Sequence, residues 1–199
     1  MISEIRGQIY DFFHSNEACQ NFFYKPQNEE KYVAYYTSMY LLADTTESLS
    51  AHRATGFSKN PLRAYLEFWG IMQAIIIQQD SICELYESVK GKKLDTKELT
   101  SWMKLRFLRN TCAGHPVKRN RPKSKPQTRT FMGRNFGGYK KITYEKWEKP
   151  ESVNDYSEPL KNISHPEVKL DELISSYEKE AVQKLQHILE AMKTRWPNT

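Results

Sequence analysis

The stretch that decides the fold is residues 60–90, NPLRAYLEFWGIMQAIIIQQDSICELYESVK. Asn60 before Pro61 is a helix start signal, because Asn caps free N–H groups and Pro fits the first helical position. Two adjacent apolar stripes at helical spacing run along this segment: Leu62, Leu66, Trp69, Ile76 and Cys83 in one, and Tyr65, Phe68, Met72, Ile75 and Ile82 in the other. A stripe this wide predicts a central helix that contacts two or more partners.

Helical patterns earlier in the chain supply such partners. Residues 2 to about 14 place apolar side chains along one helical face. Asn28 caps a long helix that stops near Gly56, with Glu29 and Glu30 complementing its dipole. We expect the following residues on its buried side: Val33, Tyr36, Tyr40, Ala43 and Leu49.

Two further helices are predicted around a β-prone insertion. Asp95 or Thr96 caps a helix that ends at Gly114, and residues 170–196 form the last helix. Residues 117–128 predict a flexible basic loop, and the runs 130–132 and 141–144 predict a β-hairpin. The fold class is therefore all-α: an antiparallel helical bundle of four to five helices with a small β-hairpin inserted before the last helix. We expect a single domain over residues 1–199, with the basic loop and hairpin inserted at about 117–150.

Positive charge is concentrated in one segment. The chain has a formal net charge of +6 and a pI of about 9.1, but residues 118–149 contain eleven Lys and Arg against two Glu. The rest of the chain is therefore net negative. A basic surplus of this kind predicts an acidic partner, with nucleic acid the first candidate.

Cysteine usage and hydropathy limit the classes of protein to which the chain could belong. The chain has an odd number of cysteines, and they lie far apart: Cys19, Cys83 and Cys112. This pattern argues against a disulfide framework or a zinc motif, and we expect no metal or cofactor. The N-terminus does not resemble a signal peptide, and the longest purely aliphatic run, 74–77, is far shorter than the ~20 residues of a membrane span. We expect a soluble, cytoplasmic protein without a membrane partner.

The strongest candidate site is the run LRFLRNTCAGHP at residues 105–116. It places the permanent cation of Arg109, the amide of Asn110 and the imidazole of His115 near a helix end, and Pro116 disfavours α geometry at His115. Cleavage of RNA needs a base, an acid and a cation, and this scheme requires no metal ligand. The alternative is a helix C-terminus at which His115 interacts with the last carbonyls.

This run resembles the HEPN superfamily, whose signature is an Arg and a His separated by four to six residues late in a helix, often with a polar residue after the Arg. Here five residues intervene, and Asn110 takes the polar position. The resemblance extends over roughly residues 28–116 and the last helix. It implies a helical bundle that dimerises, so that two copies of the motif share one cleft.

Many HEPN proteins are metal-independent endoribonucleases of toxin–antitoxin and other defence systems. By resemblance, Arg109 would hold the scissile phosphate, His115 would act as acid or base, and Asn110 would orient one of them. RNA, a second copy and an antitoxin are then the implied partners. The alternative is a non-catalytic HEPN-like module for nucleic-acid or nucleotide binding and dimerisation. A modifiable Tyr often stands two residues after the His, but here that residue is Val117, which puts this mode of control in doubt.

The basic segment that follows is the candidate nucleic-acid surface. Its cations supply salt-dependent affinity, and its interleaved aromatic residues Phe131, Phe136, Tyr139 and Tyr144 offer base-stacking platforms. The alternative is a solvated loop. The proposed contacts are Lys118, Arg119, Arg121, Lys123, Lys125, Arg129 and Arg134.

Three polar or reactive residues near the motif have two interpretations each. Gln79 or Asp80 could approach Arg109 from the central helix, or could face solvent or satisfy a local hydrogen bond. Cys112 lies within the motif, but core packing is favoured over a nucleophilic role.

Overall fold

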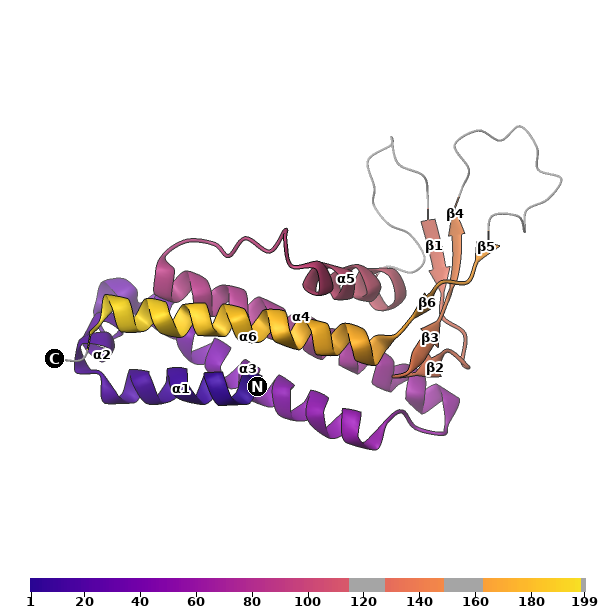
Figure 1. Ribbon diagram of the computed structural model, residues 1–199, viewed down its shortest axis with the longest axis horizontal. Helices are drawn as coiled ribbons and strands as arrows, with labels where there is room; N and C mark the ends of the chain where they lie inside the picture. The colour runs from indigo at the N-terminus through magenta and orange to yellow at the C-terminus, as the bar shows by residue number, and fades with distance from the viewer. Residues whose placement is uncertain (115–127, 149–162, 198–199) are drawn as a thin grey trace.

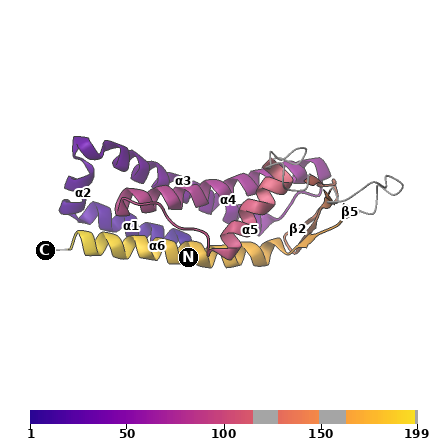
Figure 2. The same cartoon turned by 90° about the horizontal axis from the view of Figure 1, so that it is seen from above.

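A computed structural model describes residues 1–114, 128–148 and 163–197 of the chain. Within these ranges the protein is mostly helical, and four long helices run side by side as a bundle, with α5 lying across it (Figures 1 and 2). The α-helices are α1 (Ile2–Ser15), α2 (Glu17–Phe23), α3 (Glu29–Thr55), α4 (Pro61–Lys90), α5 (Thr100–Arg109) and α6 (Leu170–Arg195). None of the described helices is both long and apolar enough to span a membrane.

Helix α4 is the centre of the bundle, as its sequence predicts. The Asn60 side chain accepts hydrogen bonds from the N–H groups of Leu62 and Arg63, and Gly91 ends the helix in the left-handed region with φ +68°. Helices α3, α5 and α6 all pack against it. The fully buried residues along α4 include Phe68, Met72, Ile75, Ile82 and Leu85.

Two adjacent buried amides on α4 fix the positions of its neighbours. Gln78 donates to the Thr46 hydroxyl of α3 at 2.9 Å and accepts from the Tyr177 hydroxyl of α6 at 2.9 Å. Gln79 donates to the backbone carbonyl of Trp102 in α5 at 3.2 Å. Because a buried amide without partners costs about 1–3 kcal/mol, these bonds favour one register of the three helices.

The prediction that the first apolar stripe of α4 is buried is wrong for the N-terminal half of the helix. Leu62, Leu66 and Trp69 are 57%, 64% and 40% exposed. Packing of α4 against α3, α5 and α6 buries the adjacent faces and leaves this one uncovered within the described residues.

The predicted buried side of α3 is also wrong at three positions. Val33, Tyr36 and Tyr40 are 55%, 49% and 53% exposed, whereas Leu49 is buried as expected. Polar Ser38 and Thr45 share the buried face with the apolar residues, because the Thr45 hydroxyl bonds to the Leu41 carbonyl of its own helix. The face that packs is formed by Tyr35, Ser38, Met39, Leu42, Thr45 and Leu49.

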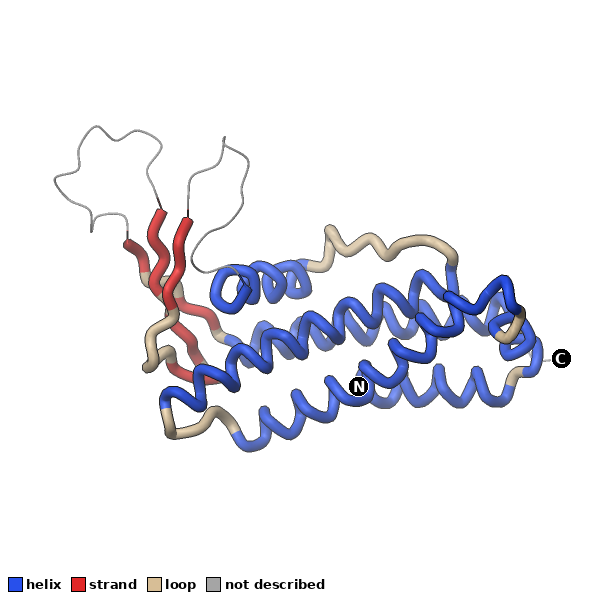
Figure 3. Tube along the Cα trace, turned by 180° about the vertical axis from the view of Figure 1, so that it is seen from behind, coloured by secondary structure: helices blue, strands red, loops and turns tan. Residues whose placement is uncertain are grey.

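Two small antiparallel sheets replace the single predicted hairpin and cap one end of the bundle (Figure 3). One sheet orders its strands β1 (Thr128–Phe131), β4 (Glu145–Glu148) and β5 (Ile163–Ser164); the other orders them β2 (Gly137–Gly138), β3 (Lys141–Thr143) and β6 (Glu167–Val168). The two runs expected to pair with each other therefore belong to different sheets. The fold is predominantly α with a β region.

A tight turn accounts for this division. Gly137 has φ +102°, and a Cβ there would lie 2.2 Å from the Lys141 carbonyl oxygen, so only Gly fits. The turn pairs Gly137 with Ile142, which leaves β1 to pair with β4.

The sheets are joined to the helical core by buried aromatic and polar contacts. The Phe136 ring packs on Phe57 and Phe68, with centroids 5.5 and 5.4 Å apart. His52 of α3 hydrogen-bonds through Nδ1 to the Tyr139 hydroxyl at 2.7 Å, and burial raises the pKa of Tyr139 to about 12. Sheet and bundle thus share one hydrophobic core.

A matched pair of substitutions on α4 tests which stripe is packed. We expect Leu85→Ala to lower the free energy of unfolding by about 2–5 kcal/mol, because it leaves a cavity in the core. Leu66→Ala removes the same atoms from an exposed position and should change the free energy of unfolding by less than about 0.5 kcal/mol. Urea denaturation of both variants measures these two changes in stability. Equal losses would show that the Leu66 face is packed as tightly as the Leu85 face.

Candidate functional site

The helix that carries the motif continues into a widened turn. Helix α5 is followed from Arg109 by a π-helical turn, Asn110–Gly114, and the residues that come directly after Gly114 lie outside the described ranges. The Asn110 N–H is shared between the carbonyls of Arg106 and Phe107, and Thr111 and Cys112 are buried. Isolated π-helical turns occur frequently at functional sites.

The start of α5 differs from the sequence prediction. The helix begins at Thr100, not at Asp95 or Thr96, and Asp95 instead accepts a local hydrogen bond from the Lys97 N–H. Its first turn is capped by Glu180 of α6, whose carboxylate oxygens accept from the N–H groups of Ser101 at 2.9 Å and Trp102 at 2.8 Å. A carboxylate at this position also complements the helix dipole.

Arg109 is held by two amide groups. Its Nη1 donates to Asn110 Oδ1 at 3.1 Å, and its Nη2 donates to Gln73 Oε1 of α4 at 3.0 Å. Both acceptors are neutral, and no carboxylate of the described chain forms an ion pair with Arg109. Within the described ranges, the guanidinium is therefore oriented by neutral groups and neutralised by none.

The preceding Arg of the same helix has a different environment. Arg106, one turn earlier, forms an ion pair with Asp80 of α4. Asp80 thus lies beside the motif helix but pairs with Arg106, and Gln79 is buried and bonds to the Trp102 carbonyl. Neither contacts Arg109. Sequence reasoning missed Gln73, although its spacing of seven from Asp80 places both on one helical face.

Gly114 lies directly against the Arg109 guanidinium. A Cβ at Gly114 would be 3.0 Å from Arg109 Nη1 and 3.5 Å from Cζ. Such a distance is closer than ordinary van der Waals contact, so Gly permits the close approach. Gly114 is also the residue bonded to His115 in the chain.

Part of the predicted site lies outside the described residues. This applies to His115 and to five of the predicted nucleic-acid contacts: Lys118, Arg119, Arg121, Lys123 and Lys125. Arg129 and Arg134 are described, and both are exposed. The Arg129 guanidinium lies 6.0 Å from the centroid of the Trp147 ring on the neighbouring strand.

Strand β1 is attached to the motif turn, which is the π-helical turn Asn110–Gly114. The Thr130 hydroxyl donates to the Thr111 carbonyl, which joins the strand carrying Arg129 to the turn that follows Arg109. This bond gives the Thr111 carbonyl a partner from the sheet.

Most of the aromatic residues expected to stack on bases are not available for stacking. Phe136 and Tyr144 are buried, and Tyr139 is partly buried against His52. Phe131 is 60% exposed. Trp69 is a further exposed aromatic that sequence reasoning placed in the core; it lies one turn before Gln73 on α4.

Within the described ranges, no group of three or more His, Cys, Asp and Glu side chains is arranged to hold a metal ion. Comparison of this chain with protein-family models, curated proteins and solved structures found no match.

Cys112 has the properties of a core residue. It is 2% exposed, and burial raises the pKa of its thiol to about 12. Because the thiolate is the reactive form, this environment suppresses nucleophilicity near neutral pH. The buried environment supports the packing interpretation.

Alkylation tests this assignment. At pH 9 an ordinary thiol is mostly ionised, whereas Cys112 should be about one part in a thousand thiolate. We expect Cys112 in the native protein to react with iodoacetamide at least ~100-fold more slowly than in denaturant, as followed by mass spectrometry of its peptide. Partly exposed Cys83 should react faster in the native state. Rapid native labelling of Cys112 would instead support a reactive thiol.

Proposed function

We propose that this protein is a metal-independent endoribonuclease of the HEPN type, with Arg109, Asn110 and His115 at its centre. The observation that supports the proposal most strongly is the charge state around Arg109. Its guanidinium is fixed by Asn110 and Gln73 but paired with no carboxylate of the described chain. An oriented, uncompensated Arg is suited to binding a phosphate.

The proposed chemistry assigns a separate role to each group. A base takes the proton of the ribose 2′-hydroxyl, the 2′-oxygen attacks phosphorus, and the bond to the 5′-oxygen breaks as an acid protonates that oxygen. Arg109 stabilises the negative charge that develops on the phosphoryl oxygens. Asn110 orients Arg109 through its 3.1 Å bond, and His115 supplies the base or the acid.

A second copy of the chain completes this scheme. The base and the acid act on opposite sides of phosphorus, and the motif contributes a single imidazole per chain. We propose a homodimer in which two motifs face one cleft, as the HEPN resemblance implies. Through the Thr130–Thr111 bond, Arg129 is carried on a strand attached to the motif turn, where it can add to the affinity for RNA. An antitoxin partner belongs to the same proposal.

RNA cleavage in EDTA tests the assignment, with Arg106 as a matched control. We expect Arg109→Ala and His115→Ala each to lower the cleavage rate of a single-stranded RNA by about 100-fold or more. Arg106→Ala removes an identical side chain one turn away and breaks the Asp80 pair, so it should retain cleavage to within about threefold. Gel analysis of end-labelled RNA measures all three rates.

The same assay separates the alternative function. A binding module would hold RNA in filter-binding assays with a steep dependence on salt, but wild type would not cleave it. Cleavage that survives both Arg109→Ala and His115→Ala would contradict the proposed site.

Gly114 provides a finer test of Arg109 geometry. In Gly114→Ala the added Cβ must displace the guanidinium by a few tenths of an ångström, and we expect cleavage to fall by about 3- to 10-fold. Its free energy of unfolding should stay within about 1 kcal/mol of wild type, because Ala is favoured over Gly in a helix. Gly7→Ala in α1 adds a Cβ that meets nothing within 4 Å and serves as the control. Full activity of Gly114→Ala would show that this contact does not position Arg109.

A further inference from the structure

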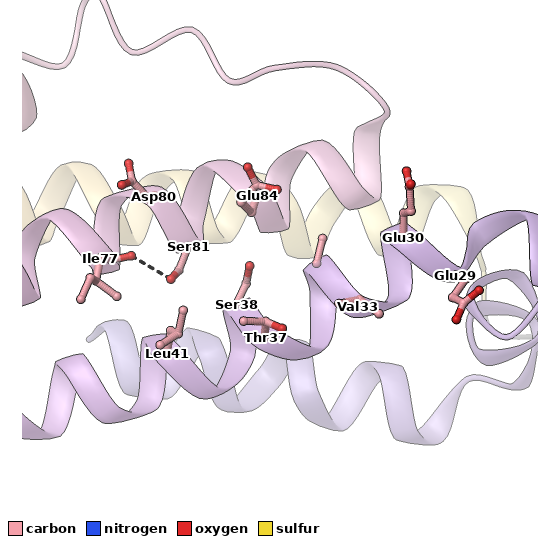
Figure 4. A pocket seen from close by; sticks show the side chains of 11 residues that line it. Glu29, Glu30, Val33, Thr37, Ser38, Leu41, Ile77, Asp80, Ser81 and Glu84 are labelled. Atoms are coloured by element: carbon pink, nitrogen blue, oxygen red, sulfur yellow. Dashed lines mark hydrogen bonds between the residues drawn. The ribbon is translucent and has the colours of Figure 1, made fainter.

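A groove between α3 and α4 lies outside the proposed active site. Its volume is about 650 Å³ (Figure 4). It is lined by Glu29, Glu30, Val33, Ala34, Thr37, Ser38, Leu41, Ile77, Asp80, Ser81 and Glu84.

The groove combines aliphatic surface with the hydroxyl groups of Thr37, Ser38 and Ser81. Val33, Leu41 and Ile77 contribute aliphatic surface from the two helices (Figure 4). The Ser81 hydroxyl turns back to the Ile77 carbonyl at 2.8 Å and is already satisfied. An occupant would therefore contact the aliphatic floor of the groove through apolar side chains.

The rim of the groove is acidic. Glu29, Glu30 and Glu84 are exposed and have no ion-pair partner in the part of the chain that the structure describes, while Asp80 pairs with Arg106. Lys31 is the cation nearest to Glu30 in sequence, but it bonds to Asn28 and lies 5.3 Å from the Phe22 ring centroid. The rim therefore presents uncompensated negative charge.

An exposed aromatic stripe adjoins the groove. Val33, Tyr36 and Tyr40 lie on the solvent side of α3, and the Tyr36 and Tyr40 ring centroids are 4.7 Å apart. The spacing of these residues is that of a packed helical face, yet no described element covers them. Tyr is enriched in protein interfaces because it offers apolar area and a hydroxyl together.

We propose that this groove binds a basic amphipathic helix of a partner protein. Apolar side chains of the helix occupy the floor and contact the Val33–Tyr36–Tyr40 stripe, and its Lys or Arg residues face Glu29, Glu30 and Glu84. Charge complementarity selects this occupant. A nucleic acid would be repelled by the rim, whereas a basic helix neutralises it.

The length of the groove fits such a helix. The lining residues of α3 run from Glu29 to Leu41, which corresponds to about 18 Å along the helix axis. Three to four turns of a partner helix cover this length, with anchors at i, i+3 or i+4, and i+7. Salt should weaken the complex because its ionic contacts lie at an exposed rim.

Selection from a phage-displayed library of helical 16-residue peptides, panned on the full-length protein, tests the proposal. We expect recovered peptides to combine apolar residues at helical spacing with an excess of Lys and Arg. Fluorescence anisotropy of the synthetic peptides should show at least tenfold weaker binding to Glu30→Lys/Glu84→Lys and to Leu41→Asp. The control Asp11→Lys/Glu47→Lys reverses two exposed acids outside the groove and should bind as wild type does. Thermal melting of each variant verifies that it is folded.

Several outcomes would overturn the proposal. These are the recovery of no binder, recovery of peptides without basic residues, and binding that is equal in the groove and control variants. Light scattering tests whether a second copy of this chain occupies the groove. If Glu30→Lys/Glu84→Lys converts a dimer to a monomer, the groove is a self-association surface and the proposal of a partner helix is wrong. None of these results depends on RNA cleavage.

Discussion

The structure depends on the exclusion of water from three sides of α4. Burial of its aliphatic and aromatic residues drives the assembly, but apolar contact alone permits several registers. The two neighbouring amides of Gln78 and Gln79 limit that freedom, because a buried polar group without a partner is costly: Gln78 bonds through both its nitrogen and its oxygen, and Gln79 through its nitrogen. Their bonds reach α3, α6 and α5 separately. Packing supplies the stability, and these polar contacts select the arrangement.

Much of the helical framework could be predicted from periodicity and caps. The Asn60 cap and the Phe68–Met72–Ile75–Ile82 stripe are present in α4 as expected. The errors arose where both sides of a helix carry apolar residues. In α3, the Tyr side chains are apolar enough to suggest burial, whereas the face that packs includes Ser38 and Thr45, and the Thr45 hydroxyl bonds to the Leu41 carbonyl of its own helix. The separation into two sheets depends on the turn at Gly137, where a Cβ would collide with the Lys141 carbonyl oxygen. The sequence does not show this collision, because it arises only once the chain has folded.

The sequence identified the motif helix, but not the contacts that distinguish its residues. Arg106 and Arg109 are chemically identical and lie on neighbouring turns. Only the crossing of α5 over α4 determines that one meets Asp80 and the other meets Gln73. Among the residues that the structure describes, one guanidinium is thus neutralised by a carboxylate and the other is held by neutral amides alone. A pairing of residues 26 to 36 positions apart has no local signature, so the structure was needed to reveal it.

The Glu180 cap on α5 has a consequence for the timing of folding during synthesis. The first turn of the motif helix takes its two N–H acceptors from a residue about 80 positions later in the chain. A nascent chain that has emerged only as far as the motif lacks this cap, together with the packing of α6. The motif helix is therefore completed only after α6 has been synthesised and has docked. Assembly of the site around Arg109 then waits for a segment that lies far later in the chain than the motif itself.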